Sequence, residues 1–180
     1  MYNGRERKLN RAKSIDYSLP GFYYLTFLTK NRLEWFGEIK NNKMVLNEWG
    51  KIVCRQLLWL EQQYDHVRLD EWIIMPNHVH VIVEILHASN PTPVRNGRDR
   101  SLQAWGDRDR RVQEKKRKPI PELIGALKTT SSKWIHRNGL FEFKWHKSYH
   151  DRVLRSQSEL EHARWYIRTN PGRWHRDRNN

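Results

Sequence analysis

Residues 67–84 carry the feature that most constrains the fold, a pair of β-strand patterns separated by a very short turn. The run VRLDEWIIM at 67–75 is rich in β-branched and aromatic residues, and HVHVIVE at 78–84 alternates between two kinds of side chain. Pro76 and Asn77 between them are turn formers. Because so short a connection joins antiparallel neighbours, we expect these two strands to pair antiparallel within a sheet.

The second of these strands should divide its side chains between the two faces of the sheet. Successive side chains in a strand point to opposite faces, so His78 and His80 share one face, while Val79, Val81 and Val83 share the other. We expect the valines to pack in a core and the imidazoles to converge on an exposed site. Two imidazoles on one strand face can share a metal ion, and the alternative is a pair of polar residues on a solvated face.

Other segments predict further strands and helices around this pair. Asn47 is a suitable N-cap for an amphipathic helix, and Ser156 with Glu159 forms a capping-box pattern at the start of a last helix. The expected elements are a strand at 21–29, a short hairpin at 36–46, helices at 47–64, 119–137 and 156–170, and a strand at 148–154. A chain of 180 residues is long enough for one domain with a core, so we expect a single domain.

The charge of the chain favours a polyanionic partner. Lys and Arg total 34 against 20 Asp and Glu, which gives a formal net charge of +14. With many Trp, Tyr and Arg present, nucleic acid is the favoured partner, and the alternative is a basic protein that is merely soluble. Two segments concentrate this charge: an N-terminal arm at 1–19, and an insert at 87–118 with ten Lys or Arg and four Asp or Glu. Each is either a nucleic-acid contact or a tolerated segment without a function.

The sequence contains no apolar run of the roughly 20 residues that would span a bilayer. The basic N-terminus is not followed by the apolar stretch of a secretory signal. The single cysteine, Cys54, cannot form an internal disulfide and lies among the apolar positions of a predicted helix. We therefore expect a soluble cytoplasmic protein with no membrane partner.

The last predicted helix offers a second pair of polar side chains. Tyr166 and Asn170 are four residues apart, and so they lie on one face of a helix. A phenol and a carboxamide placed in this way can contact the same ion or phosphate. The alternative is a tyrosine that packs in the core with its hydroxyl at the edge.

Three separated stretches of the sequence together resemble one family. They are FYYLTFLTKNR at 22–32, LDEWIIMPNHVH at 69–80, and WHKSYHDRVLR at 145–155 followed by ELEHARWYIRTNPGRW at 159–174. In this order they resemble the single-tyrosine HUH transposases, in particular the REP-associated tyrosine transposases. The resemblance runs from about residue 17 to the C-terminus and excludes the insert at 87–118.

The resemblance implies a fold and a set of roles. The implied fold is α+β, a ferredoxin-like or RRM-like HUH fold whose central antiparallel sheet of four to five strands is flanked by helices. His78 and His80 match the metal-ligand pair, Asn170 matches the third ligand, and Tyr166 matches the nucleophile. The implied activity is nicking and rejoining of single-stranded DNA with palindromic hairpins, by a monomer or a homodimer.

The residues themselves are suited to this chemistry. A phenol with a pKa near roughly 10 is a poor nucleophile at neutral pH and needs an activated phosphate. A divalent ion can polarise that phosphate, and attack by Tyr166 would leave a 5′-phosphotyrosine and a free 3′-hydroxyl. Two His and one Asn would also suit Zn²⁺ or Fe²⁺, but the resemblance favours Mg²⁺ or Mn²⁺.

Other residues are weaker candidates. Tyr149, beside His150 and Asp151, ranks second as nucleophile, and we expect it on a strand near the site. Tyr23, Tyr24 and Tyr64 are expected to be core or rim aromatics, and the candidate DNA contacts are Arg32, His150, Arg152 and Arg155. Two other functions stay open. One is a non-catalytic protein that binds hairpin or single-stranded DNA, and the other is a metal-dependent phosphoesterase that uses a metal-bound water.

Overall fold

A computed structural model of the chain describes residues 16–87 and 117–177. Its elements are β1 Gly21–Leu28, η1 Lys30–Arg32, β2 Gly37–Lys40, β3 Lys43–Leu46, α1 Glu48–Gln63, β4 Val67–Ile74, β5 His78–Ile85, α2 Ile120–Arg137, β6 His150–Leu154, α3 Gln157–Thr169 and η2 Pro171–Arg176.

Four of the strands form the central sheet, in the order β4-β5-β1-β6. All three pairings are antiparallel, and β4 and β5 pair across their short turn as the sequence predicts. The prediction of an α+β fold with a central antiparallel sheet flanked by helices is confirmed. The strands β2 and β3 form a separate two-stranded arm.

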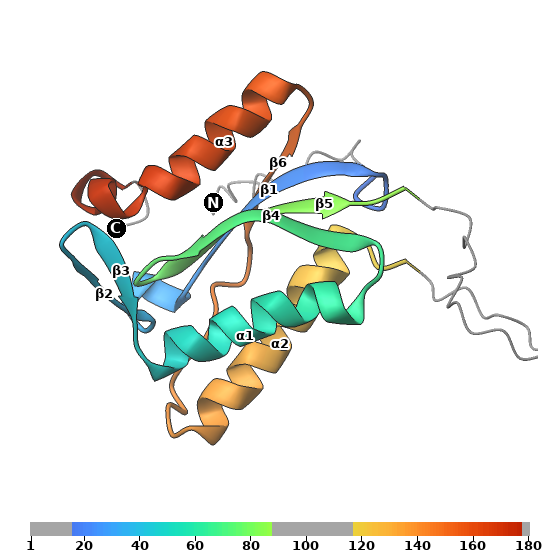
Figure 1. Cartoon of the computed structure of the whole chain (residues 1–180). Helices are drawn as coiled ribbons and strands as arrows, with labels where there is room; N and C mark the ends of the chain where they lie inside the picture. Colours follow the sequence, from blue (N-terminus) through green and yellow to red (C-terminus); the bar gives the residue numbers. More distant parts are fainter. Residues whose placement is uncertain (1–15, 88–116, 178–180) are drawn as a thin grey trace, which may run out of the picture.

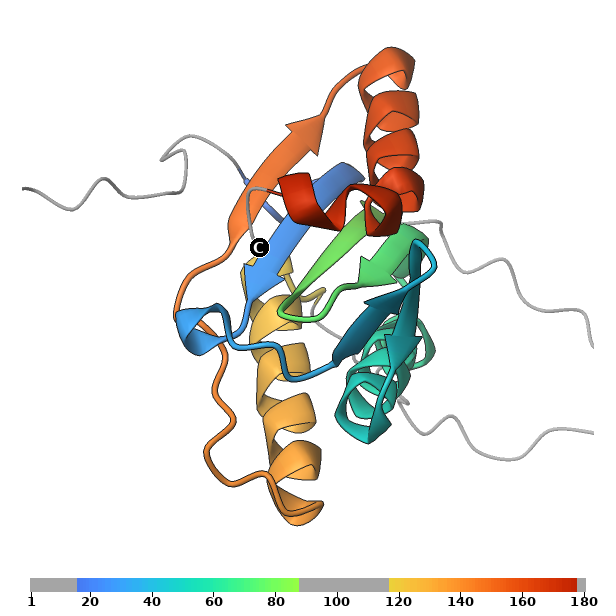
Figure 2. The same ribbon diagram turned by 90° about the vertical axis from the view of Figure 1, so that its left-hand side faces the viewer.

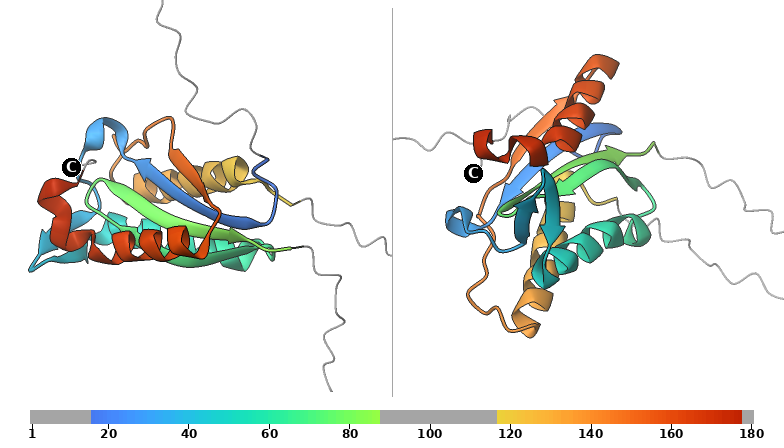
Figure 3. Two further views of the ribbon diagram at one scale, coloured as in Figure 1. Left: turned by 90° about the horizontal axis from the view of Figure 1, so that it is seen from above. Right: turned by 60° about the vertical axis from the view of Figure 1, so that its left-hand side comes forward.

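The helices lie in two layers, one on each face of this sheet (Figure 1). One face is covered by α1 and α2, which also contact each other, and the other face is covered by α3. After α3 the chain turns back as η2, which crosses the sheet and contacts β3 (Figure 2). Seen from above, α3 lies over the sheet near β4 and β5 (Figure 3).

The main core lies between the sheet and the pair α1 and α2. Val79, Val81 and Val83 of β5 point into it, as their alternation predicts, together with Leu25 and Phe27 of β1. A smaller cluster lies under α3 and contains Ile82, Leu154, Leu160, Ala163 and Ile167. The two faces of the sheet therefore differ in how much apolar surface they bury.

Both predicted helix caps form, although one uses its acidic residue in another way. The Asn47 side chain accepts a hydrogen bond from the Gly50 backbone N–H at 2.9 Å, and Ser156 Oγ accepts one from the Glu159 N–H at 3.2 Å. A full capping box would also bring the Glu159 carboxylate to the Ser156 N–H. Instead, this carboxylate accepts from the Arg155 N–H at 2.7 Å.

The turn of the small arm explains its sequence. Asn41 and Asn42 both have positive φ, 51° and 58°, which is the backbone of a two-residue type I′ hairpin turn. The arm is slightly shorter than the predicted 36–46, because Phe36 is fully buried and belongs to the core. The strand predicted at 148–154 begins at His150.

The two basic segments lie mostly outside the described residues. Of the arm at 1–19, only residues 16–19 are described, and Tyr17 among them is buried and hydrogen-bonds to Asp151. Of the insert at 87–118, the described ends lie side by side, because the Arg117 guanidinium donates to the carbonyl oxygens of Leu86 and His87. Within the described ranges, no helix is both long and apolar enough to cross a membrane.

Candidate active site

The two histidines of β5 point to the face of the sheet that α3 and η2 cover. His78 is 0% and His80 is 2% exposed, so the expectation of an exposed site is wrong. Trp174 of η2 stacks on the His78 ring at a centroid distance of 6.0 Å, and the Tyr166 ring of α3 meets His80 edge-on at 5.4 Å. The histidines are buried because the C-terminal part of the chain folds back over them.

Each histidine is oriented by hydrogen bonds at its Nδ1 atom. His78 Nδ1 lies 2.7 Å from Asn77 Oδ1, an acceptor, so this nitrogen carries the proton and leaves a lone pair on Nε2. His80 Nδ1 lies 2.8 Å from both the Tyr24 and the Thr26 hydroxyl. Since a hydroxyl can donate or accept, this pair supports either tautomer of His80.

The two Nε2 atoms point at each other, 3.0 Å apart. Because His78 Nε2 carries a lone pair, it can accept a hydrogen bond from a protonated His80 Nε2. Alternatively, both Nε2 atoms carry lone pairs, and both face a shared cation. Two nitrogens each about 2.1 Å from one ion, at a right angle, would lie about 3.0 Å apart, which fits the observed separation.

A carboxylate completes this cluster. Asp177 Oδ2 lies 3.7 Å from His78 Nε2 and 4.0 Å from His80 Nε2, and its side chain is 1% exposed. The three side chains therefore form a group that could hold a metal ion. A site with a carboxylate oxygen suits Mg²⁺ or Mn²⁺ better than two imidazoles alone.

Burial sets the protonation state of the histidine pair. It lowers the pKa of both His78 and His80, and for His78 the neighbouring His80 lowers the pKa further. The Asp177 charge acts in the opposite direction on both pKa values. The pair is therefore neutral near pH 7, which is the state that ligates metals.

Tyr166 and Asn170 lie together at this cluster. Burial raises the pKa of Tyr166, the Asp177 charge raises it further, and a hydrogen bond from the Asn170 side chain lowers it. Asn170 ends α3 and is 2% exposed, and its buried Oδ1 has no hydrogen-bond partner among the described residues. A buried carbonyl oxygen without a donor is costly unless it has another partner, such as a cation. The residues present thus fit a divalent ion.

Two ion pairs hold α3 in this position. The Arg164 guanidinium binds Asp70 through two hydrogen bonds, at 2.8 and 2.5 Å, and Arg168 pairs with Glu71 at 2.6 Å. Asp70 and Glu71 occupy the irregularity in β4, where the register with β5 shifts between Leu69 and Trp72. This bulge therefore presents two carboxylates to the helix that carries Tyr166.

A hollow of about 500 Å³ opens between β1, β6 and α3, beside His80 and Tyr166. His150 and Arg152, two of the predicted DNA contacts, line it, together with His162 of α3. Leu154 and Ala163 supply apolar wall. Glu159 also lines the hollow and pairs with Arg152, so its wall is partly apolar and partly charged, with both signs of charge, and it includes Tyr166.

The remaining candidates from the sequence are two arginines, which are exposed, and one tyrosine, which lies in the core. Arg32 is exposed, but its charge is close enough to contribute to lowering the pKa of His78. Arg155 is exposed just before α3. Tyr149, the second-ranked nucleophile, is 5% exposed and belongs to the core on the α2 side of the sheet. The expectation that it lies near the site is wrong, because it falls on the same side of the chain as Asp151 and Val153.

Four contributors to the site were missed in the sequence. From the sequence, Asn77 was interpreted only as a turn former and Tyr24 as a core or rim aromatic. In the structure, Asn77 orients His78 and Tyr24 orients His80. Thr26 lies directly opposite His80 in the β1–β5 register. A signal for Tyr24 and Thr26 exists in the alternation of β1, but using it requires that register. For Asp177, in a basic tail, the sequence carries no signal.

Comparison of sequences identifies a relative of this chain. No family model matches the chain. An uncharacterised protein of Haemophilus influenzae is 29% identical over 175 residues, which covers 95% of this chain and 91% of that protein.

Two solved structures match the chain to different degrees. One is a REP-associated tyrosine transposase bound to a REP hairpin, with a TM-score of 0.56 and 12% identity, covering 91% of this chain and 74% of that one. The other, a Deinococcus radiodurans protein provisionally named a transposase, gives a TM-score of 0.46 at 16% identity, covering 88% of this chain and 98% of that one. The first of these matches shows that the chain has the fold of a REP-associated tyrosine transposase.

Proposed function

We propose that this protein is a transposase of the REP-associated tyrosine type, which nicks and rejoins hairpin-bearing single-stranded DNA through a 5′-phosphotyrosine at a divalent-metal site. The observation that carries the proposal is one spatial arrangement. The Tyr166 ring lies 5.4 Å from that of His80, whose Nε2 is 3.0 Å from that of His78. Mid-chain imidazoles and a C-terminal phenol thus meet on one face of the sheet.

His78 and His80 would hold Mg²⁺ or Mn²⁺, with Asn170, Asp177 or both as oxygen ligands. Asn170 is favoured by its buried Oδ1, and Asp177 by its carboxylate near both imidazoles. The bound ion would supply positive charge that polarises the scissile phosphate and offsets charge in the transition state. Asn77, Tyr24 and Thr26 would fix the rings so that both Nε2 atoms face the ion.

Tyr166 would supply the nucleophile. Its oxygen forms a bond to phosphorus, the bond from phosphorus to the 3′ oxygen breaks, the phenol loses its proton, and the departing oxygen takes one up. In the reverse step a 3′-hydroxyl attacks the phosphotyrosine, so strands are rejoined without ATP. Since burial and Asp177 raise the pKa of Tyr166, positive charge in the site is needed for the phenolate to form.

The hollow beside Tyr166 would hold the nucleotide next to the scissile phosphate. Its volume of about 500 Å³ exceeds that of a single base, and Leu154 and Ala163 offer apolar contact. His150 and Arg152 lie on its wall and could contact the backbone of the strand. The net charge of +14 would provide the general attraction to DNA.

The test is formation of a covalent adduct. The full chain is incubated with Mn²⁺ and single-stranded DNA that carries a hairpin and a label at its 3′ end, because a 5′-phosphotyrosine retains the 3′ part of the strand, and the products are separated on a denaturing protein gel. We expect a protein–DNA adduct that Tyr166→Phe abolishes. Tyr64→Phe, which alters a half-buried aromatic outside the site, should leave the adduct intact, and so should Tyr149→Phe.

The other two functions predict different gels. A metal-dependent phosphoesterase would still cleave the DNA after Tyr166→Phe and would form no adduct. A non-catalytic binding protein would shift the DNA on a native gel without cleaving it. Either result would overturn the proposal.

The oxygen ligands can be separated by calorimetric titration of Mn²⁺ into two variants. Asn170→Ala removes the orphaned carbonyl, and Asp177→Asn removes the charge while keeping its size. Loss of an outer-shell partner typically weakens metal binding by about 10- to 100-fold, so we expect loss of a direct ligand to weaken Mn²⁺ binding by at least this much. A variant that binds Mn²⁺ as the parent does would remove that residue from the metal site.

A further inference from the structure

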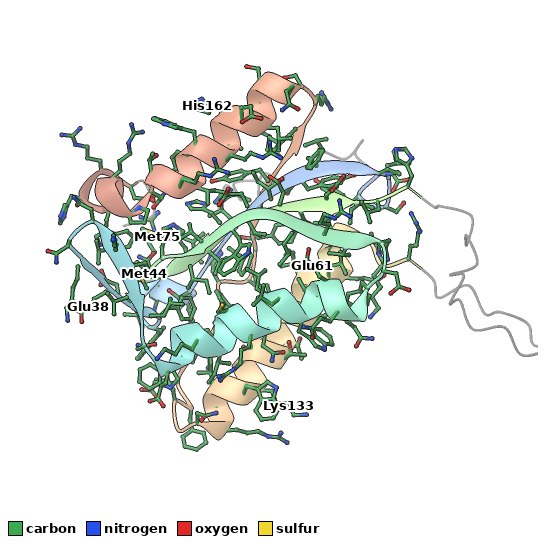
Figure 4. All side chains as sticks on the ribbon, in the orientation of Figure 1. Glu38, Met44, Glu61, Met75, Lys133 and His162 are labelled. Atoms are coloured by element: carbon green, nitrogen blue, oxygen red, sulfur yellow. The ribbon has the colours of Figure 1, made fainter. Side chains whose placement is uncertain are left out.

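A second hollow lies on the opposite side of the sheet, between α2 and the segment that leads into β6. It is broad and open, with a volume of about 670 Å³. Its lining residues, which we call the α2 groove, are Lys128, Thr129, Ser132, Lys133, His136, Trp145, His146 and Lys147. None of these described residues is Asp or Glu. In Figure 4, Lys133 lies on α2 and His162 on α3, on opposite sides of the sheet.

We propose that the α2 groove binds the phosphates of a DNA duplex stem, next to the unpaired strand that enters the site. This inference rests on the proposed function, since it assigns the stem of the hairpin to a particular surface.

The groove offers hydroxyl donors that the helix does not use. In the run TTSS at 129–132, the Thr130 and Ser131 hydroxyls donate back to the carbonyls of Ala126 at 2.9 Å and Leu127 at 2.6 Å. Thr129 and Ser132 make no side-chain hydrogen bond within the described residues and line the groove. Both are poorer helix formers than Ala, so helix propensity does not account for their presence here. Hydroxyls and lysines are common phosphate contacts.

The groove is held in a fixed shape by contacts between its two walls. The Lys128 ammonium donates to the carbonyls of His146 at 2.9 Å and Ser148 at 3.1 Å. On the same loop, Trp145 Nε1 donates to Ser131 Oγ at 3.0 Å, and His136 Nε2 lies 2.8 Å from the Phe143 carbonyl. A preformed surface binds with less loss of conformational entropy. Lys128 thus positions the loop, while Lys133 and Lys147 are exposed.

The composition of the groove favours paired DNA over a single strand. Proteins that bind single strands stack bases on aromatic faces. The ring of Trp145 instead packs against Phe27, Phe36 and Phe143, with centroid distances of 5.2–5.3 Å. The remaining donors suit phosphates, which a duplex presents on its outside. Gly125, one turn earlier in α2, also leaves open space for a close approach.

The groove lies close to the site along the chain. Lys147 is three residues before His150, which lines the hollow beside Tyr166. An extended chain spans at most about 3.5 Å per residue, so their Cα atoms are within roughly 11 Å. That is about three steps of 3.4 Å along one DNA strand. Because β6 is an edge strand, a DNA molecule that passes over this edge can contact both hollows.

The test compares two charge-reversal variants of the full chain. Lys133→Glu with Lys147→Glu changes the groove, and Lys51→Glu with Arg55→Glu makes the same change in charge on the exposed side of α1. Binding of a fluorescent hairpin and of an unpaired strand of equal length is measured by anisotropy in EDTA, over a series of salt concentrations. Circular dichroism confirms that each variant is folded.

We expect the groove variant to bind the hairpin about tenfold more weakly, and its salt slope to fall by about two, since each phosphate contact contributes about 0.9. The unpaired strand and the α1 variant should change by less than about threefold. The neutral pair Thr129→Ala with Ser132→Ala should weaken only hairpin binding. Equal losses in both charge variants, or equal losses for both DNAs, would overturn the inference.

Adduct formation separates this inference from the proposed function. In Mn²⁺ the groove variant should reach the parent's rate at saturating hairpin, but at a half-saturating DNA concentration about tenfold higher. If the parent forms no adduct with any DNA, the proposed function fails, and anisotropy still decides whether the groove binds a stem.

Discussion

Strand β5 sends Val79, Val81 and Val83 to one face of the sheet and His78 and His80 to the other, and the two faces are covered differently. The valine face packs against α1 and α2 in the large core. The histidine face is covered by α3 and η2, with a small apolar cluster, two ion pairs to β4 and a hollow that reaches the tyrosine. The large apolar core and the candidate site thus lie on opposite faces of the same strands.

The difference between the two covers explains why the histidines can be buried and neutral in a chain with so many basic residues. Their rings are held by specific hydrogen bonds, and their cover is a C-terminal segment fastened to the sheet by few contacts. A face held by few apolar contacts opens more easily than a core. We therefore expect the cover over the histidines to open at a lower cost in free energy than the face that α1 and α2 cover.

The largest expected effect compares one leucine from each face. Leu57 of α1 is 0% exposed in the large core, and Leu160 of α3 is 5% exposed in the small cluster. Leu57→Ala should lower the free energy of unfolding by about 4 kcal/mol, and Leu160→Ala by about 2 kcal/mol, because the cavity under α3 can collapse more easily. Urea unfolding measures both values. Equal losses would contradict the difference between the faces.

Mn²⁺ should stabilise the histidine face. At a free concentration 100 times its Kd, the ion should raise the free energy of unfolding by about 2.7 kcal/mol. His80→Ala should abolish this gain, while His87→Ala, at an exposed position just beyond β5, should keep it. Thermal unfolding with and without Mn²⁺ gives the comparison. A gain that survives in His80→Ala would place the ion elsewhere.

Acid should destabilise the metal-free protein through the same face. The pKa values of His78 and His80 are lower in the folded protein than the value of 6.5 for a free side chain. Below about pH 6.5 the unfolded chain therefore binds more protons, and stability falls as pH falls. In EDTA we expect a loss of about 2 kcal/mol between pH 7 and pH 5 from His78, whose pKa is lowered to about 3, and a further loss from His80. A folded variant with His78→Asn and His80→Asn should lack this part of the loss, and an unchanged pH profile would contradict the assignment.

The elements with local signals could be predicted from the sequence. The alternation in β5 assigned the histidines and valines to opposite faces, and the caps at Asn47 and Ser156 placed the starts of two helices. The spacing of Tyr166 and Asn170 brought them to one helical face. Each of these inferences needs only the period of one element.

The parts that failed depend on contacts between distant segments. The burial of the histidines comes from Trp174 and Asp177, which lie beyond the point where Pro171 ends the last helix. The roles of Tyr24 and Thr26 depend on the register of β1 with β5. Register and chain return are tertiary properties, and no local pattern in this sequence encodes them.

The smallest effect concerns the ion pairs that fasten α3 over the site. Arg164 and Asp70 form a two-bond pair whose side chains are 24% and 16% exposed, whereas Arg152 and Glu159 lie 65% and 33% exposed. A double-mutant cycle with Arg164→Ala and Asp70→Ala should give a coupling free energy of about 0.5–1 kcal/mol, after allowance for solvent screening. The cycle for Arg152 and Glu159 should give no measurable coupling.

High salt should weaken the coupling between Arg164 and Asp70, because a partly exposed pair is screened by ions. If both cycles gave the same coupling free energy, the ion pairs between α3 and β4 would stabilise the protein no more than an ordinary surface pair does. The small apolar cluster alone would then hold α3 over the site.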